Sequence, residues 1–173
     1  YDVGAGIYGD FLEKITLNDN VIHDNLGHGL YLYGGKNDII QNVISNNIGV
    51  DGGGAYFTQG FNTLMDNTIS ENSASQGGGL FLFQDSTILI NNLIHQNSTT
   101  FLWGGGLFAQ QTDVTLINNT VSSNISKYGG GAFIETSNFK LDSNSISNNS
   151  ANEFGGGGMH IQNSIGRLYK NSF

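Results

Sequence analysis

Residues 104–124 read GGGLFAQQTDVTLINNTVSSN, and this stretch decides the fold. Three glycines precede an aliphatic and an aromatic residue, and two copies of a shorter unit follow. In each copy an aliphatic residue stands three positions before an asparagine, as Leu116 before Asn119 and Val121 before Asn124. Apolar and polar residues alternate within the units, which is typical of short β-strands, and the glycines and asparagines are typical of the turns between them.

The same pattern recurs along the whole chain. Its first asparagine falls at residues 20, 42, 67, 92, 119, 144 and 171, in steps of 22 to 27 residues. Helical repeats have longer units and do not carry three consecutive glycines, so the repeat indicates a solenoid of strands. We predict an all-β chain folded as a parallel β-helix of about seven turns, with three short strands in each turn. The preference for right-handed crossovers favours a right-handed coil.

Equivalent positions of successive turns lie directly above one another in such a coil. A column of asparagines can then form a ladder, because each carboxamide has donors and an acceptor for its neighbours. Asparagine also tolerates the left-handed backbone conformation that a sharp corner requires. We predict two such ladders at two corners, formed by Asn20, Asn42, Asn67, Asn92, Asn119 and Asn144, and by Asn25, Asn47, Asn72, Asn97, Asn124 and Asn149.

The glycines are expected at a third corner, where a positive φ or a close backbone approach leaves no room for a Cβ atom. Aliphatic columns, such as the one that contains Leu80 and Leu107, are expected to fill a narrow dry interior. The segment between the second asparagine and the glycines varies in length, so it is the expected site of variable loops.

Composition excludes several classes of function. The 173 residues include 26 glycines and 23 asparagines, no cysteine, six basic and fourteen acidic residues, for a net charge of −8. This balance argues against nucleic acid and anionic membrane surfaces as partners. Apolar runs are too short for a transmembrane segment. The absence of cysteine excludes disulfides, thiolate metal sites and a cysteine nucleophile.

The repeats resemble the right-handed parallel β-helix of the pectin-lyase-like superfamily, and most closely the repeats of polymorphic outer membrane proteins and related bacterial surface adhesins. Nearly the whole chain from Gly4 onward takes part. The matching residues are Gly53-Gly54-Ala55, Gly130-Gly131-Ala132, Leu17 with Asn20, and Ile22 with Asn25. An aliphatic residue stands where that family typically has phenylalanine.

This resemblance implies an extracellular or cell-surface protein, of bacterial origin, that deals with a polysaccharide or a host surface. It does not select an activity, since the superfamily includes lyases, hydrolases, adhesins and phage spikes. We expect residues 1–173 to be a single β-helical segment of a longer array. The favoured function is a non-catalytic stalk or adhesin that binds a glycan, a protein or a second copy of itself. The alternative is a polysaccharide lyase or glycoside hydrolase.

The acidic and histidine residues give little support to the enzyme alternative. Asp19 and Asp66 share a column but are separated by the turn that carries Gln41, which suits an inverting carboxylate pair only loosely. His23 and His95 share an outward column three turns apart, too far to hold one metal ion. No calcium-binding Gly-Gly-x-Gly-x-Asp nonapeptide occurs, and we expect neither metal nor cofactor.

Aromatic residues are the candidate binding groups. One column alternates with the inward aliphatic residues, so it is expected to face outward, either as rings that stabilise neighbouring strands or as a stripe for a partner. It includes Tyr31, Tyr56, Phe81, Phe108 and Phe133. A second set lies in the variable loops, at Phe101, Trp103, Tyr128 and Phe154. These loop residues either fold back over the coil or form a patch for a ligand. Trp103 favours the patch, because it is the single tryptophan of the chain and tryptophan is a common anchor residue at interfaces.

Overall fold

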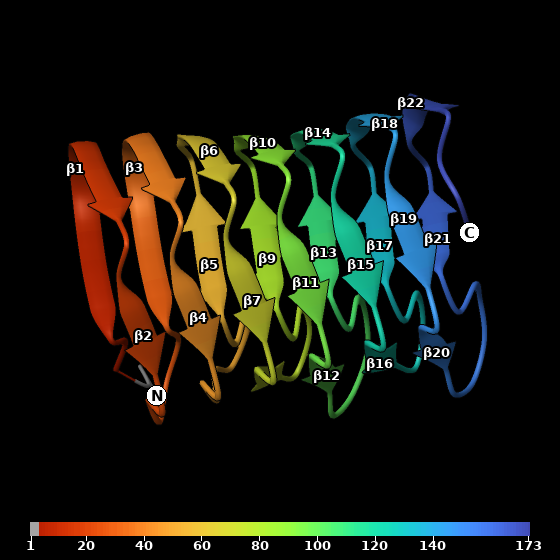
Figure 1. Cartoon of the computed structure of the whole chain (residues 1–173), viewed down its shortest axis with the longest axis horizontal. Coiled ribbons are helices and arrows are strands. Elements are labelled where there is room, and N and C mark those ends of the chain that lie inside the picture. The colour runs from red at the N-terminus through yellow and green to blue at the C-terminus, as the bar shows by residue number, and fades with distance from the viewer. Residues whose placement is uncertain (1–3) are drawn as a thin grey trace.

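The computed structural model describes residues 4–173, which form a coil of seven stacked turns (Figure 1). All strand pairs are parallel, and the described residues include no helix. The all-β parallel β-helix predicted from the repeats is therefore confirmed. Figure 1 shows the first strand, β1, and the last, β22, at opposite ends of the stack.

The first two turns each contain two strands, and the long first strand of each bends around a corner. They are β1 (Ile7–Asn18), β2 (Val21–His23), β3 (Leu30–Ile40) and β4 (Val43–Ser45). In β3 the bend falls at Gly34 and Gly35, which have φ values of 77° and 78°. Such left-handed backbone favours glycine.

The next four turns each contain four strands. The third turn has β5 (Ala55–Thr58), β6 (Phe61–Met65), β7 (Thr68–Ser70) and β8 (Ser73–Ala74). The fourth has β9 (Leu80–Phe83), β10 (Ser86–Ile90), β11 (Leu93–His95) and β12 (Ser98–Thr99). The fifth has β13 (Leu107–Gln110), β14 (Asp113–Ile117), β15 (Thr120–Ser122) and β16 (Ile125–Ser126). The sixth has β17 (Ala132–Glu135), β18 (Asn138–Asp142), β19 (Ser145–Ser147) and β20 (Ser150–Ala151). The seventh has β21 (Met159–Gln162) and β22 (Ile165–Tyr169).

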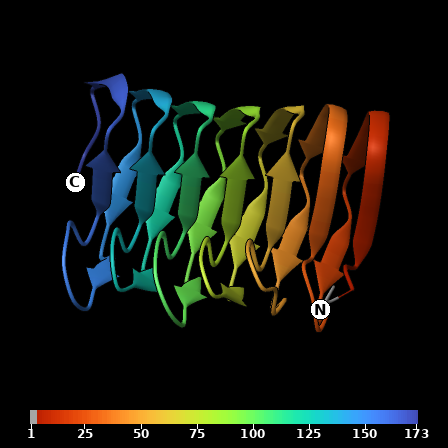
Figure 2. The same ribbon diagram turned by 180° about the vertical axis from the view of Figure 1, so that it is seen from behind.

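These strands build three main faces. The first face consists of β5, β9, β13, β17 and β21, and the second of β6, β10, β14, β18 and β22. The bent strand β3 joins them into one 12-stranded sheet. The third face is the six-stranded sheet of β2, β4, β7, β11, β15 and β19, and the two-residue strands form a small fourth sheet. The variable loops gather along one edge of the coil, at the bottom in Figure 2.

The core is a set of aliphatic columns that the strand register places inside the coil. Leu80 pairs with Leu107, Leu89 with Leu116, and all four side chains are fully buried. Because alternate residues of each face point inward, these aliphatic columns meet in a narrow apolar interior, as predicted.

The third corner also follows the prediction. Gly104 has a φ of 62°, and a Cβ atom on Gly79 would lie 2.5 Å from the carbonyl oxygen of Gly106 in the next turn. One corner residue was assigned wrongly. The left-handed residue is not the ladder asparagine but the residue before it, as at Gln41 and Asn91, where φ is 54° and 55°. The exposed residue makes the turn, which leaves the asparagine side chain pointing inward.

Candidate functional site

Two asparagine ladders run the length of the coil and confirm the predicted columns. Each Nδ2 atom donates a hydrogen bond to the Oδ1 atom of the asparagine in the next turn, at 2.8 to 3.1 Å. Asn97 is typical of the interior rungs. Its Nδ2 also donates to the carbonyl oxygen of Ile69, and its Oδ1 accepts from both the Nδ2 and the backbone N–H of Asn72. A fully buried amide thus has its hydrogen-bonding capacity filled.

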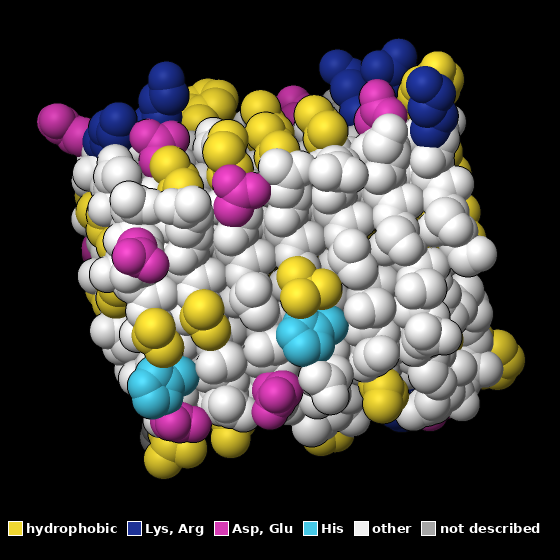
Figure 3. Space-filling view, viewed as in Figure 1, with side chains coloured by type: hydrophobic (Ala, Val, Ile, Leu, Met, Phe, Trp, Pro, Cys, Tyr) yellow, Lys and Arg dark blue, Asp and Glu magenta, His cyan; other side chains and the backbone are white. Residues whose placement is uncertain are grey.

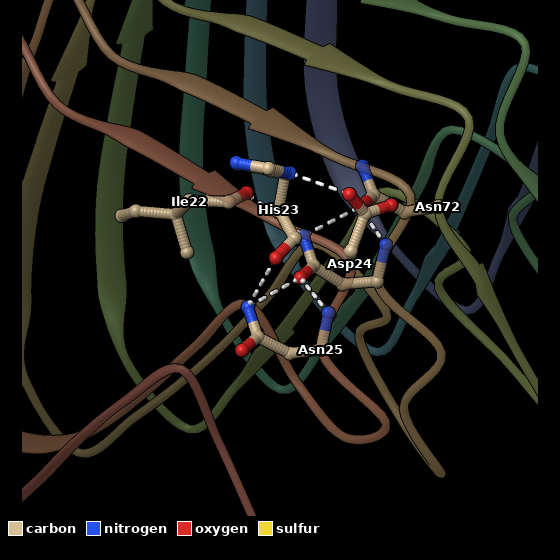
Figure 4. Close-up of polar contacts among 6 residues, drawn as sticks. Ile22, His23, Asp24, Asn25 and Asn72 are labelled. Atoms are coloured by element: carbon tan, nitrogen blue, oxygen red, sulfur yellow. Dashed lines mark hydrogen bonds and ion pairs between the residues drawn. The ribbon is translucent and has the colours of Figure 1, made fainter.

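Figure 4 shows the start of the second ladder. Asn25 donates from Nδ2 to the backbone oxygen of His23, which belongs to its own turn, and to Oδ1 of Asn47 in the next turn. His23 points away from the ladder and lies with Nδ1 2.6 Å from Asp24 Oδ2. The ladder is a structural element, while the histidine and the aspartate lie on the exposed rim of the corner.

The aromatic column is more buried than expected. Rings of successive turns lie 4.6 to 5.5 Å apart from Tyr8 through His160. Tyr8 is 63% exposed, but Phe81, Phe108 and Phe133 are at most 3% exposed. The prediction of an outward stripe is therefore wrong at these three turns. The rings do point away from the main core, but the variable loops cover them and form a second apolar cluster.

The loop aromatics divide into two groups. Trp103 folds back, with its ring 5.6 Å from that of Phe108 and 5.8 Å from that of Phe133, and Tyr128 packs against the same cluster. Phe101 and Phe154 remain 63% and 70% exposed. The structure thus separates two residues that cover the column from two that face solvent.

The acidic and histidine columns follow the predicted register. Asp19, Gln41 and Asp66 occupy the same exposed corner position of the first three turns, so the two carboxylates stand two turns apart. His23 and His95 lie in one column of the third face, with Ser45 and Ser70 between them. Within residues 4–173, no group of three or more histidine, aspartate or glutamate side chains is placed to share a metal ion.

Sequence reasoning missed a polar cluster inside the coil, behind the corner between the first and second faces. Asn37 Nδ2 donates to Asn62 Oδ1 at 2.8 Å, and Asn62 Nδ2 donates to Asp85 Oδ2 at 2.9 Å. Thr87 Oγ1 donates to the same carboxylate oxygen at 3.1 Å. The other oxygen, Asp85 Oδ1, is buried and has no hydrogen-bond partner among the described residues.

Burial sets the charge state of this carboxyl group. Desolvation raises the pKa of Asp85 from 3.8 to about 7, against the opposing effect of the hydrogen bonds from Thr87 and Asn62. Asp51, near the loops of the early turns, also has a raised pKa, because of burial, although Gln76 and His28 oppose the rise.

A shallow open groove of about 440 Å³ runs over the same corner. Asp85 and Asp113 contribute to it from neighbouring turns, and the backbone N–H of Asp113 donates to the carbonyl oxygen of Asp85 at 3.1 Å. The remaining lining is mostly uncharged and polar, from Gln84, Gln111, Thr112, Thr136, Ser137, Asn138 and Asn163. Amide and carboxyl groups in this arrangement can hydrogen-bond a polar ligand from several consecutive turns.

Comparison with known proteins assigns the chain to a family. Residues 4–173 match the family model described as a right handed beta helix region. The chain belongs to this right-handed β-helix family. No curated protein and no solved structure matches it. The handedness expected from crossover geometry is thereby supported, and no helix within residues 4–173 is long and apolar enough to cross a membrane.

Proposed function

We propose that this chain is a non-catalytic β-helical stalk outside the cell, which displays surfaces to a glycan, a protein or a second copy of itself. The observation that supports this proposal is the continuity of the ladders. Every rung from Asn20 to Asn171 and from Asn25 to Asn149 is occupied and hydrogen-bonded to the next. A rigid rod of this kind holds its surface groups at fixed spacing.

The exposed loop aromatics are the binding groups in this proposal. Phe101 and Phe154 project from loops in the fourth and sixth turns, beside the half-buried Trp103 and Tyr128. Large apolar side chains on a soluble surface favour contact with a partner. The test is a binding screen of the chain against neutral glycans and polygalacturonate, with and without calcium. Binding that Phe101→Ala weakens supports the proposal, while turnover of any of these polymers contradicts it.

The groove at Asp85 favours one second candidate, a glycoside hydrolase. A protonated Asp85 could act as general acid, while the exposed Asp113 could act as nucleophile or base. Both carboxyl groups line this groove from neighbouring turns, and glycosidases place two carboxyl groups on either side of the bond that they cleave. Release of reducing ends from a neutral glycan, lost in both Asp85→Asn and Asp113→Asn, would support this candidate. Retention of that activity in both variants would exclude the pair.

A further inference from the structure

The outer surface of the second face combines apolar residues at its centre with charged residues at its ends. Its outward side chains form three columns across β1, β3, β6, β10, β14, β18 and β22. The first column is Lys14, Lys36, Phe61, Ser86, Asp113, Asn138 and Ile165. The second is Thr16, Asp38, Thr63, Ile88, Thr115, Lys140 and Arg167. The third is Asn18, Ile40, Met65, Ile90, Ile117, Asp142 and Tyr169. Figure 3 shows this face along its upper edge, with basic groups at both ends and apolar groups between.

We propose that this face binds a second copy of the chain, in an antiparallel dimer with its two-fold axis parallel to β10. The inference deepens the proposed function, in which a second copy is one of the partners. With this axis, a turn that lies before β10 in one copy faces the turn that lies equally far after β10 in the other copy. Each of the three columns faces the same column of the other copy. The arrangement is the self-complementary interface that two-fold symmetry requires.

Charge complementarity is the first observation that supports this orientation. Asp38 in the second turn falls opposite Lys140 in the sixth turn of the other copy. The two-fold axis generates a second, identical pair. Asp38 already lies 3.2 Å from Lys14 within its own chain, so the dimer would place it between two cations. Lys36 falls opposite Asn138 and one turn from Asp113. A parallel arrangement would instead place Lys36 opposite Ile40 of the same turn, without these opposite charges.

Shape is the second observation. Phe61 is 68% exposed on β6, and its symmetry position in the other copy is that of Asp113 on β14. Asp113 lies in a hollow of about 600 Å³ over β10, β14, β18 and β22, which Ser86, Ile88 and Asn138 also line. The protruding ring of one copy therefore meets the depression of the other, again twice.

The centre of the proposed interface is apolar. Met65 of one copy falls opposite Ile117 of the other. Ile88 and Ile90 lie at the two-fold axis, so each faces the same residue of the other copy. Ile88 is 41% exposed and Ile117 is 39% exposed in the single chain. Two aligned sheets pack about 10 Å apart, which allows such side chains to meet. An apolar centre with charged groups around it is the usual arrangement of a protein interface.

The size of the face predicts weak association. Seven strands about 4.8 Å apart, each with about five residues of 3.3 Å, cover roughly 500 Å² per copy. The total of roughly 1,000 Å² lies at the lower limit of specific interfaces. We therefore expect a reversible dimer, visible only at high protein concentration.

The test is sedimentation equilibrium of the chain over a concentration series that reaches about 1 mM, where an association free energy near 4 kcal/mol becomes measurable. We expect wild-type dimers. Lys140→Glu and Asp38→Lys should each weaken association about tenfold, and the double variant should restore it. Lys127→Glu is the matched control, because Lys127 pairs with Glu153 in the loops, away from this face. Far-ultraviolet circular dichroism verifies that each variant is folded.

A second variant tests the axis itself. Ile88→Lys places two like charges against each other on the axis and should abolish the dimer, whereas Ile125→Lys, on an exposed two-residue strand, should not. A monomeric wild type, a double variant no better than the single ones, or an Ile88→Lys dimer of unchanged affinity would overturn the proposal. The glycan screen with Phe101→Ala is independent of this face, so the two proposals can fail separately.

Discussion

Replacement of Asp85 with asparagine should stabilise the coil at pH 8 and remove much of its pH dependence. The rise in the pKa of Asp85 from 3.8 to about 7 means that the folded state binds a proton more tightly than the unfolded state does. At 1.36 kcal/mol per pH unit, holding the carboxylate charged in the folded state costs about 4 kcal/mol above pH 7. This cost is absent below the unfolded pKa and grows as the pH rises from about 4 to 7.

Asparagine has nearly the same shape as aspartate but stays neutral. Its Oδ1 atom can accept from Asn62 Nδ2 and Thr87 Oγ1, as the carboxylate does in the wild type. We expect the stability of Asp85→Asn to change little with pH, while that of the wild type falls on going from pH 4 to pH 8. A residual slope of the same sign is expected from Asp51, whose pKa is also raised.

The assay is urea unfolding followed by far-ultraviolet circular dichroism at a series of pH values from 4 to 8. Asp113→Asn is the matched control, because this carboxyl group belongs to the neighbouring turn and is exposed. The free energy of unfolding of Asp113→Asn, plotted against pH, should run parallel to that of the wild type. If the profile of Asp85→Asn also ran parallel to the wild type, the reasoning would be refuted, because the carboxyl group would then be hydrated in the folded state.

Three further substitutions test the ladder, the loop cover and the glycine corner by urea unfolding. Asn97→Ala should cost about 3 to 5 kcal/mol, because it leaves buried partners on both neighbouring turns unsatisfied, whereas Asn91→Ala on the exposed rim should cost only about 1 to 2 kcal/mol, from its left-handed backbone. Trp103→Ala should cost about 2 to 3 kcal/mol through lost contact with the ring column, and Phe101→Ala less than about 0.5 kcal/mol; equal effects would show that Trp103 does not cover the column. Gly79→Ala should cost about 1 to 3 kcal/mol, since its Cβ atom would meet a backbone oxygen of the next turn, and an unchanged stability would contradict the close stacking of the corners.

The parts of the structure that repeat were predictable from the sequence. Identical residues at equal spacing identify columns, so the ladders, the aliphatic core and the register of His23 with Ser45 followed directly. The repeat does not say which of two adjacent corner residues takes the left-handed conformation. Asn91 and Asn92 are chemically alike, and only the backbone shows that Asn91 makes the turn.

The parts that differ from turn to turn were not predictable in this way. The inward column of the second face reads Ile15, Asn37, Asn62, Thr87, Val114, Phe139 and Gly166, so no repeated residue marks the polar cluster in its second to fourth turns. The cover over Phe108 was missed for a related reason. It comes from loops of variable length, whose path the spacing of the strands does not determine.

The ladders also give the molecule an electrical direction. In every rung the turn nearer the N-terminus donates from Nδ2 and the following turn accepts at Oδ1, so the amide dipoles of both columns add instead of cancelling. Each Oδ1 points toward the N-terminal end, which becomes the negative pole, and the N–H that bonds the next rung points toward the C-terminal end. Two such rods side by side attract when they point in opposite directions and repel when they point the same way. The polarity of the buried amides therefore favours the same antiparallel arrangement as the charges on the outer face.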